Sequence, residues 1–285
     1  MAVLDSGIQD HPAFSGREIR EWDMVVDAQG EPVPIDLDAG HGTAVASIIG
    51  GSDSRLPGVA PAAELLSFRI LDNDGITTSF TLAEAIVAAA DAGADVINVS
   101  LGSSGDSLLV RDAVAYAHDR GALIVAAAGN EGAQQVSYPA AIEGVVAVAA
   151  SDARGEHLPF SNAGDSLVEG GMAAPGYGVV SAWPGERVVD FSGTSASAPF
   201  VSGAVAATMS QYDGMNAQEA YAHLIEYSNE AGAPLADPQF GSGNLNIGRS
   251  MDVGTRGITD AAVASYYYDP VAVAETGGQN MAQVV

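Results

Sequence analysis

Three short, glycine-flanked segments of the chain carry side chains that could do chemistry together. Asp5 ends the apolar run in VLDSG, His41 lies in GHGTAVA, and Ser195 lies in SGTSASAP, where an alanine-rich stretch begins. A serine hydroxyl is a weak nucleophile at neutral pH unless a base takes its proton, and histidine is a suitable base. Singly, each residue has an ordinary explanation as a turn residue, a structural histidine or a helix N-cap. In this order and with these flanks, the three segments together are far from a chance combination.

The elements that must bring these distant residues together are predicted to alternate between strands and helices. Short apolar runs rich in β-branched residues predict buried strands at 94–101, 122–128 and 144–150. Amphipathic or alanine-rich stretches predict helices at 79–92, 107–120, 195–211 and 217–228. Gly93 and Gly121 follow the first two helices, as C-terminal stops should. The alternation predicts an α/β fold with a mostly parallel sheet and helices on both faces, whose active loops gather at the carboxyl edge of the sheet.

Glycine and proline mark the remaining segments. Residues 29–40 and 152–190 are rich in glycine, proline and aspartate, which predicts loops or short strands. Pro199 lies four residues after Ser195 and is tolerated in the first turn of a helix, so it predicts that this helix starts at or just after Ser195. Segment 257–285 loses the helical period and has a strand-like pattern.

Composition excludes several classes of protein. The chain has 285 residues and a net charge of −26, and all ten of its basic residues are arginine, so binding to nucleic acid or to anionic membranes is disfavoured. The absence of cysteine excludes disulfides, thiolate metal sites and cysteine nucleophiles. No apolar run is long enough to cross a membrane. Met1–Asp5 has no basic region and is too short for a signal peptide, so any export signal lies outside this sequence.

With these motifs in view, the chain resembles the subtilases, the subtilisin-like serine peptidases of family S8. The resemblance covers residues 1 to about 250 and rests on VLDSG, GHGTAVA and FSGTSASAP in the order Asp, His, Ser. Four intervening segments also match, namely GVAP at 58–61, DVINVSLG at 95–102, AAAGNEG at 126–132 and AAPG at 173–176. The resemblance implies a three-layer subtilisin-like fold and a serine endopeptidase that hydrolyses peptide bonds through an acyl-enzyme intermediate.

The resemblance also implies a role for each catalytic residue. Ser195 would be the nucleophile and His41 its general base and later general acid, while Asp5 would hold the imidazole in the required tautomer. Asn130, in AAAGNEG, would donate its side-chain amide to the oxyanion together with the backbone N–H of Ser195. The plain alternative for Asn130 is a turn residue beside Gly129. The start of the Ser195 helix would add a favourable dipole.

Substrate recognition is implied at three places. Ser100, Leu101 and Gly102 resemble the edge on which a substrate peptide pairs as an added strand. Ala127, Ala128 and Gly129 would line the other wall of the primary specificity pocket, where small side chains leave room for a large P1 residue. Ser137 occupies the position at the base of the pocket that is commonly glycine in the family, so it would shorten the pocket or make its floor more polar.

The chain departs from the family pattern in three respects. Its histidine motif reads HGTAVAS in place of HGTHVAG, which predicts only modest effects on packing. The loop from Gly50 to Pro57 is shorter than the calcium loop of many bacterial subtilisins, and Asp53 is its only carboxylate. A tight calcium site there is therefore not expected, since calcium takes six or more oxygen ligands. No cofactor is required for the chemistry, and a structural calcium ion elsewhere stays open.

The third departure concerns the ends of the chain. Subtilases normally have a strand, a helix and a removable propeptide before the Asp motif, which here starts at Val3. The expected organisation is a catalytic domain at 1–250 that lacks its N-terminal part, followed at 251–285 by an extension or the start of a truncated β-domain. The resemblance implies a monomer with polypeptide substrates, a propeptide as a further partner, and an extracellular or periplasmic location, with a cytoplasmic one left open.

The alternative to an active enzyme is a catalytically silent subtilase fragment or binding scaffold. The presence of all four catalytic positions favours the enzyme, and the short lead before Asp5 favours the fragment. A nucleotide-binding fold is disfavoured because no G-x-G-x-x-G opens a helix after a strand and no P-loop is present. A zinc hydrolase is disfavoured because no H-E-x-x-H occurs and the five histidines are scattered.

Overall fold

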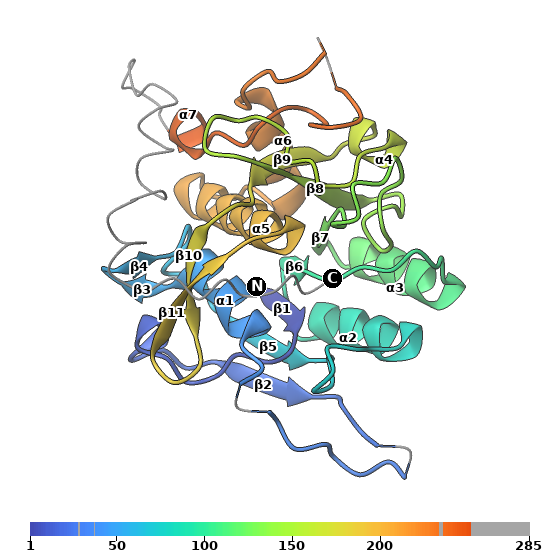
Figure 1. Cartoon of the computed structure of the whole chain (residues 1–285), viewed down its shortest axis with the longest axis vertical. Helices are drawn as coiled ribbons and strands as arrows, with labels where there is room; N and C mark the ends of the chain where they lie inside the picture. The colour runs from blue at the N-terminus through green and yellow to red at the C-terminus, as the bar shows by residue number, and fades with distance from the viewer. Residues whose placement is uncertain (28, 37, 234–235, 252–285) are drawn as a thin grey trace.

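A seven-stranded parallel sheet forms the centre of the molecule. The structure is a computed structural model that describes residues 1–27, 29–36, 38–233 and 236–251. The sheet order is β2-β5-β1-β6-β7-β8-β9, and every neighbouring pair is parallel. In that order the strands are Arg20–Asp23, Leu66–Arg69, Ala2–Asp5, Val96–Val99, Leu123–Ala127, Val145–Ser151 and Met172–Pro175. Figure 1 shows them rising from β2 at the bottom to β9 near the top.

Successive residues of the central strands supply two separate cores. In β1, Val3 packs into one hydrophobic cluster, whereas Ala2 and Leu4 pack into the other. This is the two-residue alternation of a strand that is buried on both faces. Because both faces of the sheet are apolar, both must be covered by helices.

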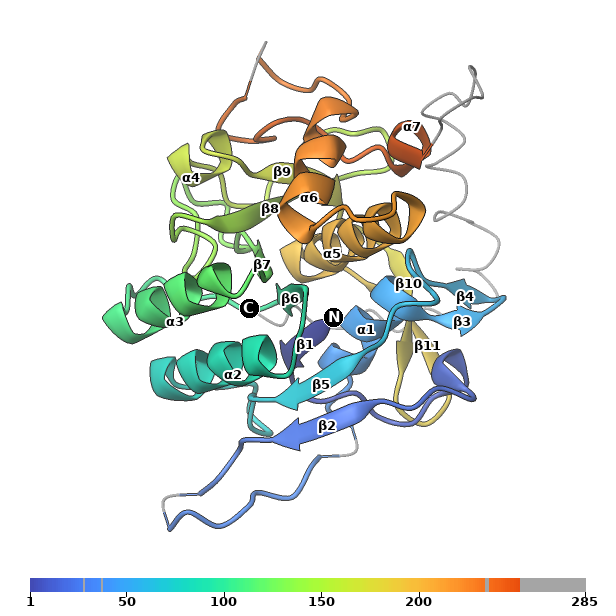
Figure 2. The ribbon, with the colours of Figure 1, turned by 180° about the vertical axis from the view of Figure 1, so that it is seen from behind.

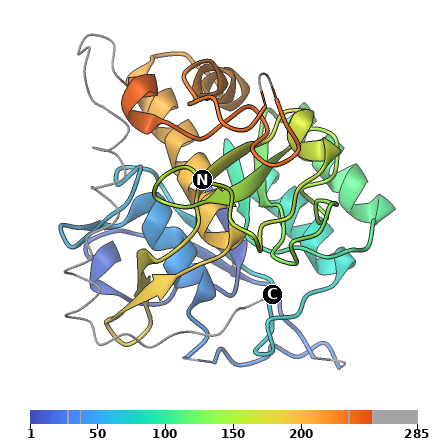
Figure 3. The ribbon, with the colours of Figure 1, turned by 45° about the horizontal axis from the view of Figure 1, so that its top comes forward.

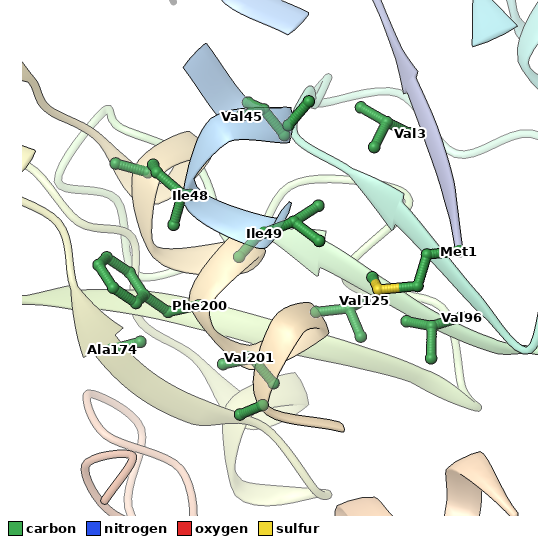
Figure 4. Close-up of a cluster of buried hydrophobic side chains, with 14 of the residues drawn as sticks. Met1, Val3, Val45, Ile48, Ile49, Val96, Val125, Ala174, Phe200 and Val201 are labelled. Atoms are coloured by element: carbon green, nitrogen blue, oxygen red, sulfur yellow. The ribbon is translucent and has the colours of Figure 1, made fainter. Parts of the chain in front are cut away.

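Helices cover both faces. Figure 2 shows α2 (Ser79–Asp91) and α3 (Leu108–Asp119) side by side on one face. The other face carries α1 (His41–Gly50), α5 (Thr194–Gln211) and α6 (Ala217–Glu226). In Figure 4, Ile49 of α1 and Phe200 and Val201 of α5 lie in one cluster with side chains of the strands. The expected α/β fold with a mostly parallel sheet and helices on both faces is therefore confirmed.

Short elements complete the described chain. They are η1 (Pro12–Phe14), α4 (Asp165–Val168), α7 (Ile247–Met251), the hairpin of β3 (Ser52–Asp53) and β4 (Leu56–Pro57), and the hairpin of β10 (Val179–Trp183) and β11 (Arg187–Phe191). The β10–β11 hairpin lies beside α1 (Figure 3), and the backbone N–H of Ala182 donates to Ser47 Oγ at 2.9 Å. In the part of the chain that the structure describes, no helix combines the length and the apolar character needed to span a membrane.

The three strands and four helices predicted from the sequence are all present, within a few residues of the predicted limits. Gly93 and Gly121 have φ of +82° and +83°, the left-handed conformation expected of glycine after a helix. The predicted place of Pro199 was wrong, because α5 starts one residue before Ser195 and the proline is its sixth residue. There it lacks the N–H that an α-helix would use to bond the carbonyl of Ser195.

The carboxyl ends of the strands point to one edge of the sheet. Asp5 is the last residue of β1, Ser100 directly follows β6, and Asn130 follows β7 by three residues. His41 and Ser195 lie in the first turns of α1 and α5. The domain predicted at 1–250 lies almost wholly within the described residues, whereas the extension predicted at 251–285 lies outside them after Met251.

Candidate active site

Asp5 and His41 form a buried pair. Asp5 is fully buried and His41 is 8% exposed. His41 Nδ1 lies 2.8 Å from Asp5 Oδ1 and 3.0 Å from Oδ2. Asp5 Oδ1 also accepts from the N–H of Ser6 at 2.7 Å. The carboxylate thus has a fixed orientation and accepts a hydrogen bond from Nδ1–H, so that Nε2 of the neutral imidazole carries no proton.

Glycine is required beside this pair. A Cβ on residue 42 would lie 2.5 Å from the carbonyl oxygen of Gly7 and 3.1 Å from Asp5 Cβ. Only glycine lets α1 start this close to the loop that follows β1. The glycine after His41 therefore has a packing reason, since it allows the first residue of α1 to contact Asp5.

Burial and charge act in opposite directions on His41. Burial alone would lower the pKa of the imidazole, because the charged form loses its hydration. The adjacent Asp5 carboxylate outweighs burial through its charge and its hydrogen bond, so the pKa of His41 is raised above its ordinary value. The ring also meets Phe191 edge-on, with centroids 5.1 Å apart. The imidazole is thus held from two sides.

Ser195 lines the same pocket as His41, but its hydroxyl bonds to a different residue. Its Oγ donates to the carbonyl oxygen of Ser100 at 3.0 Å. Within the described residues, no hydrogen bond joins Ser195 Oγ to His41, although both residues line one pocket. Catalytic hydrogen bonds are often formed only when substrate binds. The side chain of Ser195 must therefore rotate away from the carbonyl of Ser100 before its Oγ can bond to His41.

Asn130 is oriented by the residue before the serine. Its Oδ1 accepts from the N–H of Thr194 at 2.8 Å and from Thr194 Oγ1 at 3.0 Å. Thr194 Oγ1 in turn accepts from the N–H of Gly129 at 3.1 Å. With Oδ1 engaged in this way, the NH₂ group of Asn130 is the part of the amide left for a ligand.

A small cleft joins these residues to the predicted substrate-binding positions. Its lining includes His41, Asn130 and Ser195, and six of the seven predicted substrate residues: Ser100, Leu101, Gly102, Ala127, Gly129 and Ser137. Ala128 does not line the cleft; it is fully buried, and its carbonyl accepts from the N–H of Ser137 at 2.9 Å. Leu71, Gly75, Glu131 and Thr194 line the cleft as well and were not singled out from the sequence.

Comparison with known proteins now decides the family. A model described as the subtilase family matches residues 1–243. The chain belongs to the subtilase family.

The alignment with this chain covers different shares of the relatives' own lengths. The chain is 39% identical over 215 residues to a thermophilic serine proteinase of Bacillus sp. strain AK1, covering 74% of this chain but only 52% of that protein. It is 37% identical to thermitase of Thermoactinomyces vulgaris, covering 74% of this chain and 75% of thermitase. The self-cleaved protease domain of PatA has a similar fold, with a TM-score of 0.76 and 31% identity over 88% of this chain and 94% of that one.

In this subtilase, Asn162 bonds to two residues that line the cleft. It is 1% exposed, and its Nδ2 lies 2.6 Å from Glu131 Oε2 and 3.3 Å from Ser137 Oγ. Its Oδ1 accepts from the N–H groups of Glu131 and Ala133 at 3.1 Å and 2.8 Å. Sequence reasoning missed Asn162 because it lies in a loop with no periodic pattern, about thirty residues from its partners.

The short loop after α1 folds as the β3–β4 hairpin. Asp53 pairs with Arg55 at 2.9 Å, and this hydrogen bond lowers the pKa of Asp53 to about 2. Its carboxylate is thus engaged by a cation on the same hairpin. Over the described ranges of the chain, no cluster of three or more histidine, aspartate or glutamate side chains is arranged to hold a metal ion.

Proposed function

We propose that this subtilase is a serine endopeptidase that cleaves peptide bonds through an acyl-enzyme intermediate. One observation carries the proposal: Asp5 holds His41 Nδ1 at 2.8 Å in the cleft that also contains Ser195. With Nδ1 protonated and bonded to the carboxylate, Nε2 is a base available to a hydroxyl.

In the proposed reaction, Ser195 Oγ turns from Ser100 to His41 and attacks the scissile carbonyl carbon. His41 Nε2 takes the hydroxyl proton, and the electron pair of the carbonyl moves onto oxygen. When the tetrahedral intermediate collapses, the C–N bond breaks and the imidazolium gives its proton to the leaving amine. Water then attacks the ester with His41 again as base, which restores Ser195. Asp5 stays ionised and stabilises the imidazolium.

Two donors would stabilise the oxyanion. One is Asn130 Nδ2, because Oδ1 of the same amide is already bonded to Thr194. The other is the N–H of Ser195, which is the second residue of α5 and so has no acceptor within the helix. Such donors act strongly because they are oriented before the negative charge develops.

The substrate would be an extended polypeptide. We propose that it pairs with the backbone of Ser100–Gly102 and places its P1 side chain against Ala127 and Gly129, with Ser137 at the floor. Family membership supports this assignment, as it supports a monomer that acts outside the cytoplasm and has a propeptide as a further partner. A polypeptide substrate also suits a chain with a net charge of −26, which disfavours polyanionic ligands.

Cleavage of an unstructured protein such as β-casein tests the proposal. The wild-type chain should release internal fragments, identified by mass spectrometry, whereas Ser195→Ala should release none. Matching circular dichroism spectra would show that both proteins are folded. A folded wild-type chain that leaves casein and short peptide substrates intact would instead support the silent scaffold.

A further inference from the structure

The carbonyl of Ser195 lacks its helical partner. In an α-helix the carbonyl of residue 195 accepts from the N–H of residue 199. Residue 199 is proline, within the continuous helix Thr194–Gln211, so that N–H does not exist. A buried carbonyl without a donor is unfavourable, and Ser195 is 8% exposed. Another group must therefore bond this carbonyl.

Ser100 supplies the missing donor. Its Oγ donates to the carbonyl oxygen of Ser195 at 3.1 Å, while Ser195 Oγ donates to the carbonyl oxygen of Ser100 at 3.0 Å. The two serines are thus joined by a reciprocal pair of bonds across the space between β6 and α5. The hydroxyl of Ser100 replaces a bond of the helix that carries the nucleophile.

Two further buried side chains fix the direction of that hydroxyl. Asn98 Nδ2 donates to Ser100 Oγ at 2.9 Å, so the hydroxyl hydrogen of Ser100 is free to point at Ser195. Ser202 Oγ donates to Asn98 Oδ1 at 2.8 Å, which holds the amide in that orientation. Asn98 and Ser202 are both 0% exposed. Because every donor meets an acceptor, the chain of bonds runs one way, from Ser202 through Asn98 and Ser100 to Ser195.

The position of Asn98 is unusual for a structural residue. It lies in the apolar strand Val96–Val99, between Ile97 and Val99, which are also fully buried. A buried amide is tolerated there only when its hydrogen bonds are satisfied. Ser202 lies seven residues after Ser195, two turns along α5 and on the same face of the helix.

We propose that Asn98 and Ser202 are positioning residues for catalysis, which act through the hydroxyl of Ser100 to hold the backbone of Ser195 at the carboxyl end of β6. This inference rests on the proposed function. The backbone of Ser195 carries both the nucleophilic side chain and the N–H assigned to the oxyanion. A small displacement of this residue therefore misplaces two catalytic groups at once.

Ser202→Ala tests the far end of this chain of bonds without touching the active site. The expected result is a loss of about 3- to 10-fold in kcat with little change in KM, because substrate contacts are intact while the reacting groups are misplaced. Thr208→Val is the matched control on the same helix. Thr208 is fully buried, and its Oγ1 has no hydrogen-bond partner among the described residues. This variant should keep the wild-type kcat.

Restoring the helical donor provides the second test. In the wild-type background, Ser100→Ala should lower kcat by about 10-fold, because the carbonyl of Ser195 loses its only side-chain donor among the described residues. Pro199→Ala returns an N–H that can bond this carbonyl. In the Pro199→Ala background, Ser100→Ala should therefore cost no more than about 3-fold. A merely structural role for Ser100 would give the same loss in both backgrounds.

The outcomes separate this inference from the proposed function. A folded wild-type chain without peptidase activity overturns the proposed function and this inference with it. If the wild-type chain is active, two results would overturn the inference and leave the proposed function intact. One is a kcat for Ser202→Ala equal to that of Thr208→Val. The other is a loss of kcat from Ser100→Ala that is the same with and without Pro199→Ala. Melting temperatures of all variants would show that the comparison is made between folded proteins.

Discussion

Asn130 accepts two hydrogen bonds from one residue, the N–H of Thr194 at 2.8 Å and its Oγ1 at 3.0 Å. Thr194 directly precedes Ser195 at the start of α5. The loop after β7 and the helix that carries the serine are therefore fixed to each other through one amide oxygen. The same contact determines which way the amide nitrogen points.

Asn130→Asp should separate the two functions of this amide. The carboxylate keeps an acceptor for Thr194 but replaces the donating nitrogen with an oxygen. We expect kcat to fall by about 100- to 1000-fold with little change in KM, the size found when a subtilisin loses its oxyanion asparagine. The thermal midpoint should stay close to that of the wild type, because the bonds to Thr194 remain. A kcat within about threefold of the wild type would contradict the oxyanion role.

The pH dependence of kcat/KM should show an acidic limb set by His41. The pKa of His41 is raised above its ordinary value of 6.5, so the imidazolium persists to higher pH than in a free histidine. Only the neutral imidazole can accept the serine proton, so activity should rise with pH through a pKa above 6.5. Initial rates measured from about pH 5 to 9 would show this limb.

Asp5→Asn should move that limb and lower the rate. Without the carboxylate, burial alone acts on His41 and the pKa falls, so the limb shifts to lower pH. kcat should drop by about 10⁴-fold, because an amide holds the imidazole in the wrong tautomer. An unshifted limb in this variant would show that another group titrates.

Much of this architecture could be predicted from the sequence, and the limits have physical causes. The strand at 144–150 was predicted because it is a continuous apolar run, and the helix at 107–120 because its apolar residues recur at helical spacing. β2 could not be predicted in this way, since Arg20–Asp23 is polar and mostly exposed at the edge of the sheet. Asn162 and Thr194 were missed because their roles depend on partners distant in sequence.

The apolar residues of β6 predicted its secondary structure but not the contacts of its one polar side chain. They predicted a buried strand but could not show that Asn98 faces Ser202, 104 residues away. Pro199 was predicted to lie in the first turn, since a sequence does not show the first hydrogen bond of a helix. Its position inside α5 became clear only from the structure.

Ser137→Gly should enlarge the specificity pocket. The Ser137 side chain lies between the two walls, since a Cβ on Gly102 would meet its Cβ at 2.9 Å and a Cβ on Gly129 would meet its Oγ at 2.4 Å. Removing it should raise kcat/KM for a Phe P1 substrate over an Ala P1 substrate by about 3- to 10-fold. Peptide p-nitroanilides that differ only at P1 would measure this ratio. Ser104→Gly, at an exposed position, should leave the ratio unchanged.

Gly42→Ala should disturb the Asp5–His41 pair. The new methyl group would lie 2.5 Å from the carbonyl oxygen of Gly7, which is backbone and cannot move aside cheaply. We expect a loss of about 1–3 kcal/mol in the free energy of unfolding and at least about 10-fold in kcat. Gly105→Ala is the control, because its methyl group would have only Ser103 Oγ nearby, at 4.0 Å. Urea unfolding of the two variants would compare them.

Covalent labelling of the nucleophile tests the central claim most directly. A fluorophosphonate reacts with a serine that a neighbouring base has activated, and intact-mass measurement counts the adducts. The wild-type chain should gain one adduct, located on Ser195 by peptide mapping, and Ser195→Ala should gain none. His41→Ala should react far more slowly. A folded wild-type chain that gains no adduct, or gains it on a residue other than Ser195, would contradict the account.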